Sequence, residues 1–179
     1  MRTIMLVLLT IIFLLPINHT AVLANLDKQT INDLKELTDF KLLIPKKLSI
    51  KRSEIKEPYP LDLTKSIGKV RLHYFDRTGE NLLIGITQHK ATNYQEERIE
   101  IIVHPNNQSE TEIKFVEFTP NFEKGEEIVI NGNEGRFVPW GQSWMPGGIL
   151  WWIDHDTYIE MDSSHFNKKQ MIKIANSMK

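Results

Sequence analysis

Residues 148–161, "GILWWIDHDTYIEM", contain two apolar segments on either side of the polar pair His155–Asp156. Successive side chains of a strand point to opposite faces of a sheet, and a two-residue turn fixes how two such strands pair. A turn at His155–Asp156 pairs Ile153 with Tyr158 and sorts the side chains into two sets. One face then carries Leu150, Trp152, Ile159 and Met161. The stretch therefore predicts a β-hairpin with one face in a hydrophobic core.

The opposite face of this hairpin is also largely apolar: it carries Trp151, Ile153, Tyr158 and Glu160. A C-terminal helix is the expected cover for it. Asn167 is a good N-cap, Gln170 completes a capping box, and Met171 begins an apolar stripe at helical spacing. We expect this helix to pack against Trp151. The alternative is that the Trp151 face is an open groove for a ligand.

Alternating apolar and polar residues predict further strands over residues 69–75, 81–88, 98–105, 112–118, 126–130 and 135–140. We expect the strand at 112–118 to continue one antiparallel meander. Apolar residues at near-helical spacing predict an N-terminal helix within residues 26–40, and residues 41–60 indicate a loop or an edge segment. The predicted class is α+β: a curved antiparallel sheet of about seven strands with an N-terminal and a C-terminal helix packed on it.

Residues 1–24 have the three parts of a secretory signal peptide. Arg2 supplies a positive charge, residues 4–15 are apolar apart from one threonine, and small residues precede a cleavage point after Ala24. The predicted organisation is therefore a signal peptide over 1–24 and a single secreted α+β domain over 25–179. The alternative is an uncleaved anchor, but a span needs about 20 apolar residues and polar residues interrupt this stretch earlier.

Composition excludes several classes of protein. The chain has 0 cysteines, which excludes disulfides, thiol catalysis, cysteine metal sites and a lipidated cysteine anchor. Its formal net charge of −1 gives no reason to expect nucleic acid as a partner. Export without cysteine, in a chain rich in lysine and isoleucine, is typical of secreted proteins of Gram-positive bacteria. No transmembrane domain is expected after cleavage of the signal peptide.

Catalytic motifs are weak in this sequence. Ser143 follows Gly141, but the Gly-x-Ser-x-Gly spacing of a nucleophile elbow is absent. No glycine loop precedes a Lys-Ser or Lys-Thr pair, so a phosphate cradle is not indicated. His155 and His165 lie near acidic residues, but sequence neighbours seldom converge on one ion, so neither a metal site nor a cofactor is expected. The same two histidines are the nearest candidates for a secreted hydrolase that uses a histidine and a carboxylate.

Aromatic residues are concentrated between residues 140 and 158, where they form a candidate binding surface. A large ring with a free face is a common contact residue, although such rings also dominate ordinary cores. The candidate binding residues are Trp140, Trp144, Trp151, Ile153 and Tyr158.

Four segments carry a resemblance to a known family: "DLKELTDFKLLIPKKL" (33–48), "IVINGNEGRF" (128–137), the hairpin quoted above, and "IKIANSMK" (172–179). They resemble exported bacterial domains of unknown function of the DUF4367-like type. The resemblance implies a plan similar to lipoprotein-carrier folds, in which a curved antiparallel sheet wraps around helices. In such families the domain often follows the membrane segment of an anti-sigma-like regulator, and no catalytic residues are established. This sequence departs from the pattern at His155–Asp156, where a glycine is expected.

The leading hypothesis is a non-catalytic extracytoplasmic binding or interaction module, secreted or in the cell envelope. Its ligand or partner would be a lipid, a peptide or an envelope component. One alternative is the secreted hydrolase with His155 or His165. Another is a structural or sensor protein of the envelope with only protein partners.

Overall fold

The computed structural model describes residues 28–46, 48, 52–58, 61–103, 109–142 and 144–179. The predicted signal peptide and its cleavage point lie outside these residues. In chain order the elements are α1 (Lys28–Leu37), β1 (Arg52–Glu57), β2 (Lys69–Phe75), β3 (Leu82–Lys90), β4 (Gln95–Val103), β5 (Ser109–Glu117), β6 (Glu126–Ile130), β7 (Asn133–Pro139), β8 (Gly148–Asp154), β9 (Thr157–Ser163) and α2 (Lys168–Ala175). No helix among the described residues has both the length and the apolar character needed to cross a membrane.

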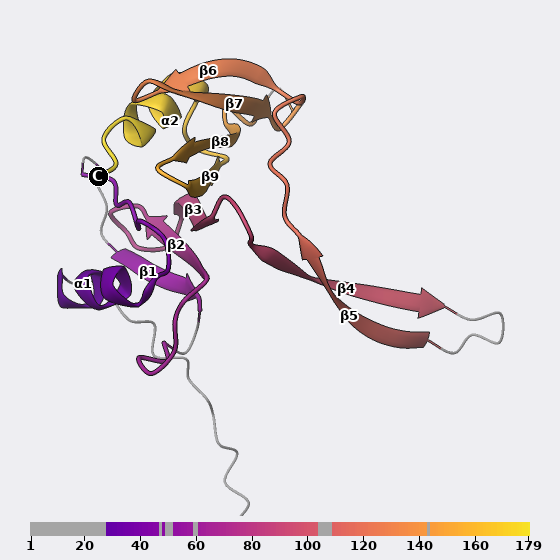
Figure 1. Ribbon diagram of the computed structural model, residues 1–179. Helices are drawn as coiled ribbons and strands as arrows, with labels where there is room; N and C mark the ends of the chain where they lie inside the picture. The colour runs from indigo at the N-terminus through magenta and orange to yellow at the C-terminus, as the bar shows by residue number, and fades with distance from the viewer. Residues whose placement is uncertain (1–27, 47, 49–51, 59–60, 104–108, 143) are drawn as a thin grey trace, which may run out of the picture.

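A seven-stranded sheet forms the body of the protein (Figure 1). Its strand order is β1-β2-β3-β9-β8-β7-β6, and every neighbouring pair is antiparallel. The segment predicted as a loop or edge supplies the edge strand β1. The α+β class, the number of strands in the sheet and the two terminal helices are therefore as predicted.

The hairpin of β8 and β9 has the predicted register. Ile153 pairs with Tyr158, and Trp152 lies opposite Ile159. The turn residues His155 and Asp156 have φ angles of 51° and 69°, a left-handed conformation that a two-residue hairpin turn requires and that glycine usually supplies. The hairpin thus keeps its geometry without the glycine that the family resemblance implies.

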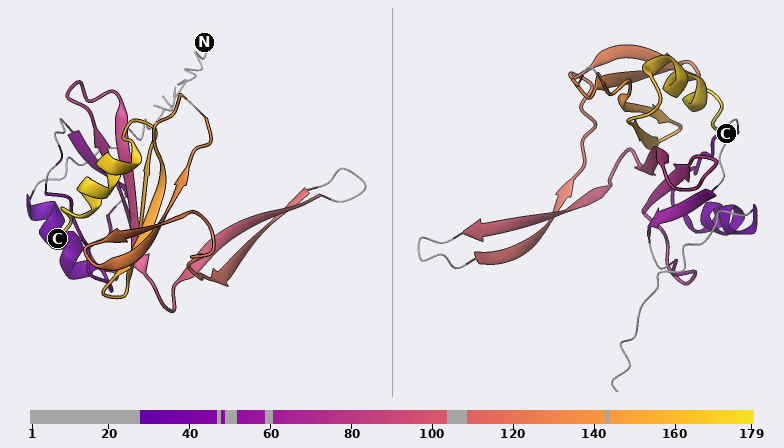
Figure 2. Two further views of the ribbon diagram at one scale, coloured as in Figure 1. Left: turned by 90° about the horizontal axis from the view of Figure 1, so that it is seen from above. Right: turned by 180° about the vertical axis from the view of Figure 1, so that it is seen from behind.

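The main core lies on one face of the sheet, between the strands and both helices (Figure 2). Leu34 of α1 and Met171 of α2 are fully buried there, beside Trp152, which is 1% exposed. We call this the inner face, and the opposite one the outer face. Since α2 joins the core that contains Trp152, the prediction that this helix covers Trp151 is wrong.

The reason for the placement of α2 lies at the end of β9. Ser163 is buried, and its hydroxyl donates to the Leu83 carbonyl at 2.6 Å. The same oxygen accepts hydrogen bonds from the backbone N–H groups of His165 and Phe166 at 3.1 and 3.0 Å. These bonds hold the turn that brings Phe166 against the main core. Helix α2 then starts at the predicted capping box of Asn167 and Gln170.

Strands β4 and β5 form a separate two-stranded ribbon that projects from the body (Figures 1 and 2). The prediction that the second of them continues one meander is therefore wrong. The edge of β3 that β4 would occupy is paired with β9 instead. One face of the ribbon carries apolar side chains that are 56–68% exposed: Ile99, Ile101, Ile113 and Phe115. Both strands exist as predicted, but they lie outside the main sheet.

Candidate functional site

The outer face is covered near β8 and β9 by residues that flank the ribbon. Ala91, Trp151 and Tyr158 are buried in a second apolar cluster, with Phe118 and Phe122 packed against it. Arg136 holds this cover in place, because its Nε donates to the Phe122 carbonyl at 2.6 Å. The cover of Trp151 therefore comes from the segment after β5 rather than from α2.

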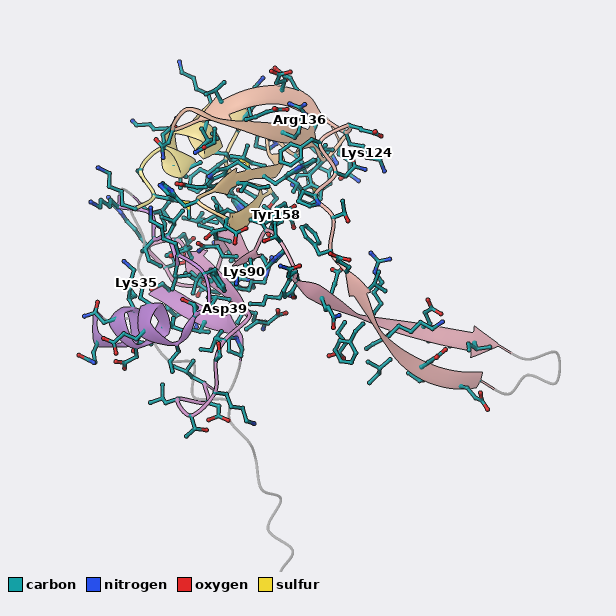
Figure 3. The ribbon with its side chains drawn as sticks, viewed as in Figure 1. Lys35, Asp39, Lys90, Lys124, Arg136 and Tyr158 are labelled. Atoms are coloured by element: carbon teal, nitrogen blue, oxygen red, sulfur yellow. The ribbon has the colours of Figure 1, made fainter. Side chains whose placement is uncertain are left out.

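Two cavities lie side by side on the outer face. The first, the polar cavity, has a volume of about 300 Å³ and is lined by Glu57, Lys69, Arg71, Thr87, His89, Tyr94, Glu96, Phe118, Tyr158 and Glu160. The second, the apolar cavity, has a volume of about 310 Å³ and is lined by Phe118, Thr119, Asn121, Lys124, Val138, Ile149, Trp151, Tyr158 and Glu160. Phe118, Tyr158 and Glu160 belong to both. We call the two cavities together the outer-face groove. Figure 3 labels Tyr158, which lines both cavities, and Lys124, which lines the apolar one.

Four aromatic rings line the polar cavity and pack against one another. His89 stacks on Tyr94 and on Tyr158, with ring centroids 3.9 and 4.9 Å apart. Phe118 meets His89 and Tyr158 edge-on, at 4.5 and 4.7 Å. The register places His89 of β3 directly opposite Tyr158 of β9, and a backbone hydrogen bond of 2.8 Å joins Phe118 to Tyr94. Burial lowers the pKa of His89, and its Nδ1 donates to the carbonyl of Lys90.

The two cations of the polar cavity each have a carboxylate partner. Arg71 donates through Nη2 to Asp162 at 2.8 Å and through Nη1 to the Thr87 hydroxyl at 2.6 Å. Lys69 forms an ion pair with Glu57 at 2.8 Å. Their charges are therefore largely balanced within the protein.

Glu160 differs from the other carboxylates of the groove. Its Oε2 accepts a hydrogen bond from the Tyr158 hydroxyl at 3.2 Å, and none of the ion pairs found among the described residues includes it. Burial raises the pKa of Glu160, with a smaller contribution from the negative charge of Asp162, and burial also raises the pKa of Tyr158. Glu160 is thus a half-buried carboxylate that forms no ion pair within the described part of the chain, where the two cavities meet.

The tryptophans predicted as binding residues separate into two groups. Trp151 and Tyr158 line the apolar cavity, and Ile153 packs against the same cluster. The Trp151 indole N–H is buried and has no hydrogen-bond partner among the described residues. Trp140 lies elsewhere, where its Nε1 donates to the Ser163 carbonyl at 2.7 Å, and Trp144 is 71% exposed. The structure therefore brings together three of the five predicted residues.

Sequence reasoning did not include Tyr94, Phe118, His89 or Glu160 among the binding residues. Glu160 was assigned to the correct face, but its half-buried setting depends on the cover supplied by Phe118. His89 reaches the site only because β3 pairs with β9, although five other strands lie between these two along the chain. The period-two pattern of each strand was the available signal, and it specifies a face rather than a neighbour.

The two histidines of the hydrolase alternative lie at opposite ends of β9, and both are exposed. His155 contacts Asp154 beside it, and its Nδ1 is 3.4 Å from Nζ of Lys41. Nδ1 of His165 lies 3.1 Å from the hydroxyl oxygen of Ser164. No cluster of acidic residues and histidines that would suit a metal ion occurs in the described part of the chain.

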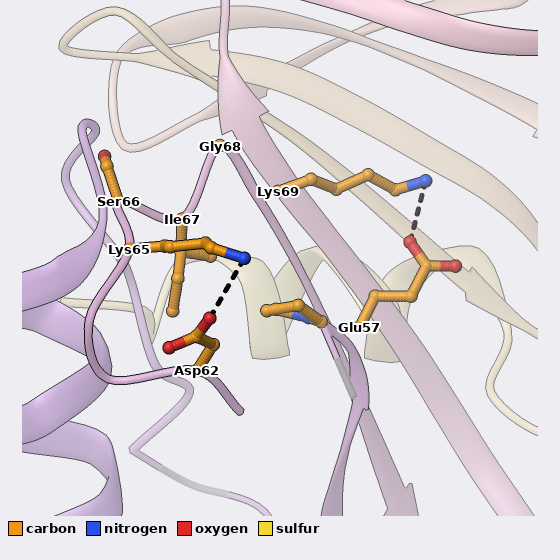
Figure 4. Close-up of a pocket in the computed structure, with 8 residues that line it drawn as sticks. Glu57, Asp62, Lys65, Ser66, Ile67, Gly68 and Lys69 are labelled. Carbon is orange, nitrogen blue, oxygen red and sulfur yellow. Dashed lines mark ion pairs between the residues drawn. The ribbon is translucent and has the colours of Figure 1, made fainter. Parts of the chain in front are cut away.

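A further cavity of about 380 Å³ lies between the end of β1 and the start of β2 (Figure 4). Two ion pairs line it: Lys65 with Asp62 at 3.2 Å and Lys69 with Glu57 at 2.8 Å. Hydrogen bonds from Thr64 lower the pKa of Asp62 to about 2. The charged groups here are already paired, so the outer-face groove is the better candidate site.

Residues 80–178 match the protein family described as "Domain of unknown function (DUF4367)". The chain belongs to this family. The matched region runs from the start of β3 to the C-terminal end, so it contains the aromatic rings of the groove and Glu160, whereas Lys69 and Arg71 precede it. No curated protein and no solved structure matches this DUF4367 chain.

Proposed function

We propose that this DUF4367 protein is a non-catalytic binding module that acts outside the cytoplasm, and that the outer-face groove is its ligand site. The observation that carries this proposal is the pair of adjoining cavities on a sheet face that neither helix covers. Ligand sites are typically concave and mostly apolar, with a few polar groups that fix orientation. Val138, Ile149 and Trp151 supply apolar walls, and Glu160 supplies a polar group.

The placement of the two helices supports the same proposal. An antiparallel sheet with helices on one face leaves its other face available for a ligand, and here that face holds the groove. The non-catalytic character is supported by the separation of His155 from His165, the only two residues that suggested a hydrolase.

Export is the part of the proposal that rests on residues 1–24. Protein recovered from the culture medium of its own host should begin at Asn25, as read by N-terminal sequencing. Protein found only in membranes, with Met1 retained, would instead favour the anchored sensor.

Native mass spectrometry of protein purified from its own secretions tests the binding function. A co-purified lipid, peptide or other small molecule should add a defined mass that is lost on mild activation. Fluorescence then locates the ligand, because Trp151 lines the groove and Trp144 does not. Removing the ligand should change the emission of wild-type and Trp144→Phe protein but not of Trp151→Phe protein. An apo mass under all mild conditions would count against the proposal.

A further inference from the structure

We propose that the outer-face groove takes an organic ammonium cation with a short apolar tail, with Glu160 as its counter-ion. This inference rests on the proposed binding function and names the chemical class of the ligand. The ammonium group would lie in the polar cavity beside Glu160, and the tail would lie in the apolar cavity.

The balance of charge in the polar cavity favours a cation. Lys69 is paired with Glu57, and Arg71 is paired with Asp162, so each of these pairs is close to neutral. Glu96 lies 3.4 Å from Arg98 at the base of the ribbon. What remains is the carboxylate of Glu160, whose one hydrogen bond among the described residues comes from the Tyr158 hydroxyl. A half-buried anion without a partner gains most from a cationic ligand.

The rings around Glu160 suit an ammonium group. Tyr94, Phe118 and Tyr158 line the same cavity as Glu160, and the ring centroid of Phe118 lies 6.2 Å from that of Tyr94 and 4.7 Å from that of Tyr158. Aromatic faces attract ammonium cations through the ring quadrupole, and groups of such rings recognise quaternary ammonium ligands. A carboxylate and several rings around one cavity therefore act on the same charge.

The apolar cavity suits the tail of the same molecule. It begins at Phe118 and Glu160 and continues over Val138, Ile149 and Trp151. Lys124 also lines it, and a positive side chain there disfavours a second ammonium group at that end. One charged head and one uncharged tail fit this division better than a cation with two charged ends.

Three probes with the same tail separate the contributions of charge and of apolar contact: hexyltrimethylammonium, hexyl sulfate and hexanol. In titration calorimetry at pH 7.5, the ammonium should bind about tenfold more tightly than either of the others. Glu160→Gln should weaken the ammonium by about tenfold and leave hexanol almost unchanged. Glu80→Gln, an exposed carboxylate outside the groove, is the matched control and should bind all three as wild type does.

A second variant keeps the test independent of any folding defect in Glu160→Gln. Phe118→Leu retains an apolar side chain but removes a ring, so it should weaken the ammonium more than hexanol. Equal or tighter binding of hexyl sulfate, or unchanged ammonium binding by folded Glu160→Gln, overturns the cation. If one of these results is obtained and a ligand without a positive charge co-purifies with the protein, the proposed binding function stands and only the proposed cationic class of ligand is wrong. If no probe binds and the purified protein is apo, both proposals fail.

Discussion

The side-chain amide of Gln88 pairs with both backbone polar groups of Leu43, accepting from its N–H and donating to its carbonyl, at 2.9 Å each. Gln88 is fully buried in β3, and Leu43 is 2% exposed. The side-chain amide of Gln88 therefore provides the hydrogen bonds that a neighbouring strand would otherwise form with the backbone of the segment after α1.

Gln88→Leu should lower the free energy of unfolding by about 2–4 kcal/mol, because it leaves a buried donor and a buried acceptor of Leu43 without partners. Urea denaturation measures this loss. Gln142→Leu is the control, since Gln142 is exposed and its change should stay within about 0.5 kcal/mol. A loss below about 1 kcal/mol for Gln88→Leu would show that Leu43 finds other partners.

The adjacent tryptophans should differ in their contribution to stability. Trp152 is 1% exposed within the main core, so Trp152→Ala should cost about 3–5 kcal/mol. Trp151 belongs to the small outer cluster and borders a cavity, so Trp151→Ala should cost about 1–3 kcal/mol, since its half-buried neighbours can move. Thermal melts compare the two variants. Equal large losses would mean that both rings are structural, and the binding role of Trp151 would fail.

Glu160→Gln should stabilise the free protein at neutral pH. The pKa of Glu160 is raised above its usual value by burial, so the folded state holds its proton more tightly than the unfolded state does. The associated stability is present at low pH and is lost as pH rises through the folded pKa. The hydrogen bond from Tyr158 and the charge of Arg71 oppose the rise in the pKa of Glu160, while Asp162 and Glu96 add to it. Urea midpoints should therefore favour Glu160→Gln at pH 7, and this advantage should shrink towards pH 4.5. An advantage that does not change with pH would contradict the assignment to ionisation.

His89 should make the protein less stable as the pH falls below 7. Burial lowers its pKa from 6.5, so between the folded pKa and 6.5 the unfolded state binds more protons. The stability is present above pH 6.5 and is lost as pH falls through the folded pKa. His89→Phe keeps a ring between Tyr94 and Tyr158 and removes the titrating group. It should show a smaller loss of stability from pH 7.5 to 5 than wild type, and exposed His165→Phe should match wild type.

The ribbon of β4 and β5 should contribute little to the stability of the body. Ile101 is 68% exposed, whereas Ile86 in β3 is fully buried. Ile101→Ala should stay within about 0.5 kcal/mol of wild type, while Ile86→Ala should lose about 2–5 kcal/mol. Matched urea titrations of the two variants test this. A large loss for Ile101→Ala would mean that the apolar face of the ribbon is covered in solution.

Local patterns in the sequence were enough to predict the individual elements. The register of β8 with β9 follows from a two-residue turn, and the start of α2 follows from the spacing of Asn167 and Gln170. These features depend on residues that are neighbours in the chain, so the alternation of side chains and the capping groups specify them directly. The predicted number of strands in the main sheet was right for a different reason. The edge strand β1 belongs to this sheet, whereas β4 and β5, which were predicted to belong to it, form the separate ribbon.

Only the tertiary structure decided which strands are neighbours. The alternating pattern of a strand specifies which of its side chains share a face, but it does not specify which other strand lies beside it in the sheet. Because β9 pairs with β3, β4 and β5 lie outside the main sheet and His89 lies opposite Tyr158. It also brings Asp162 to Arg71, although 91 residues separate them in sequence. The outer-face groove exists because of these long-range pairings, so the sequence determined its strands and faces, and the fold determined its site.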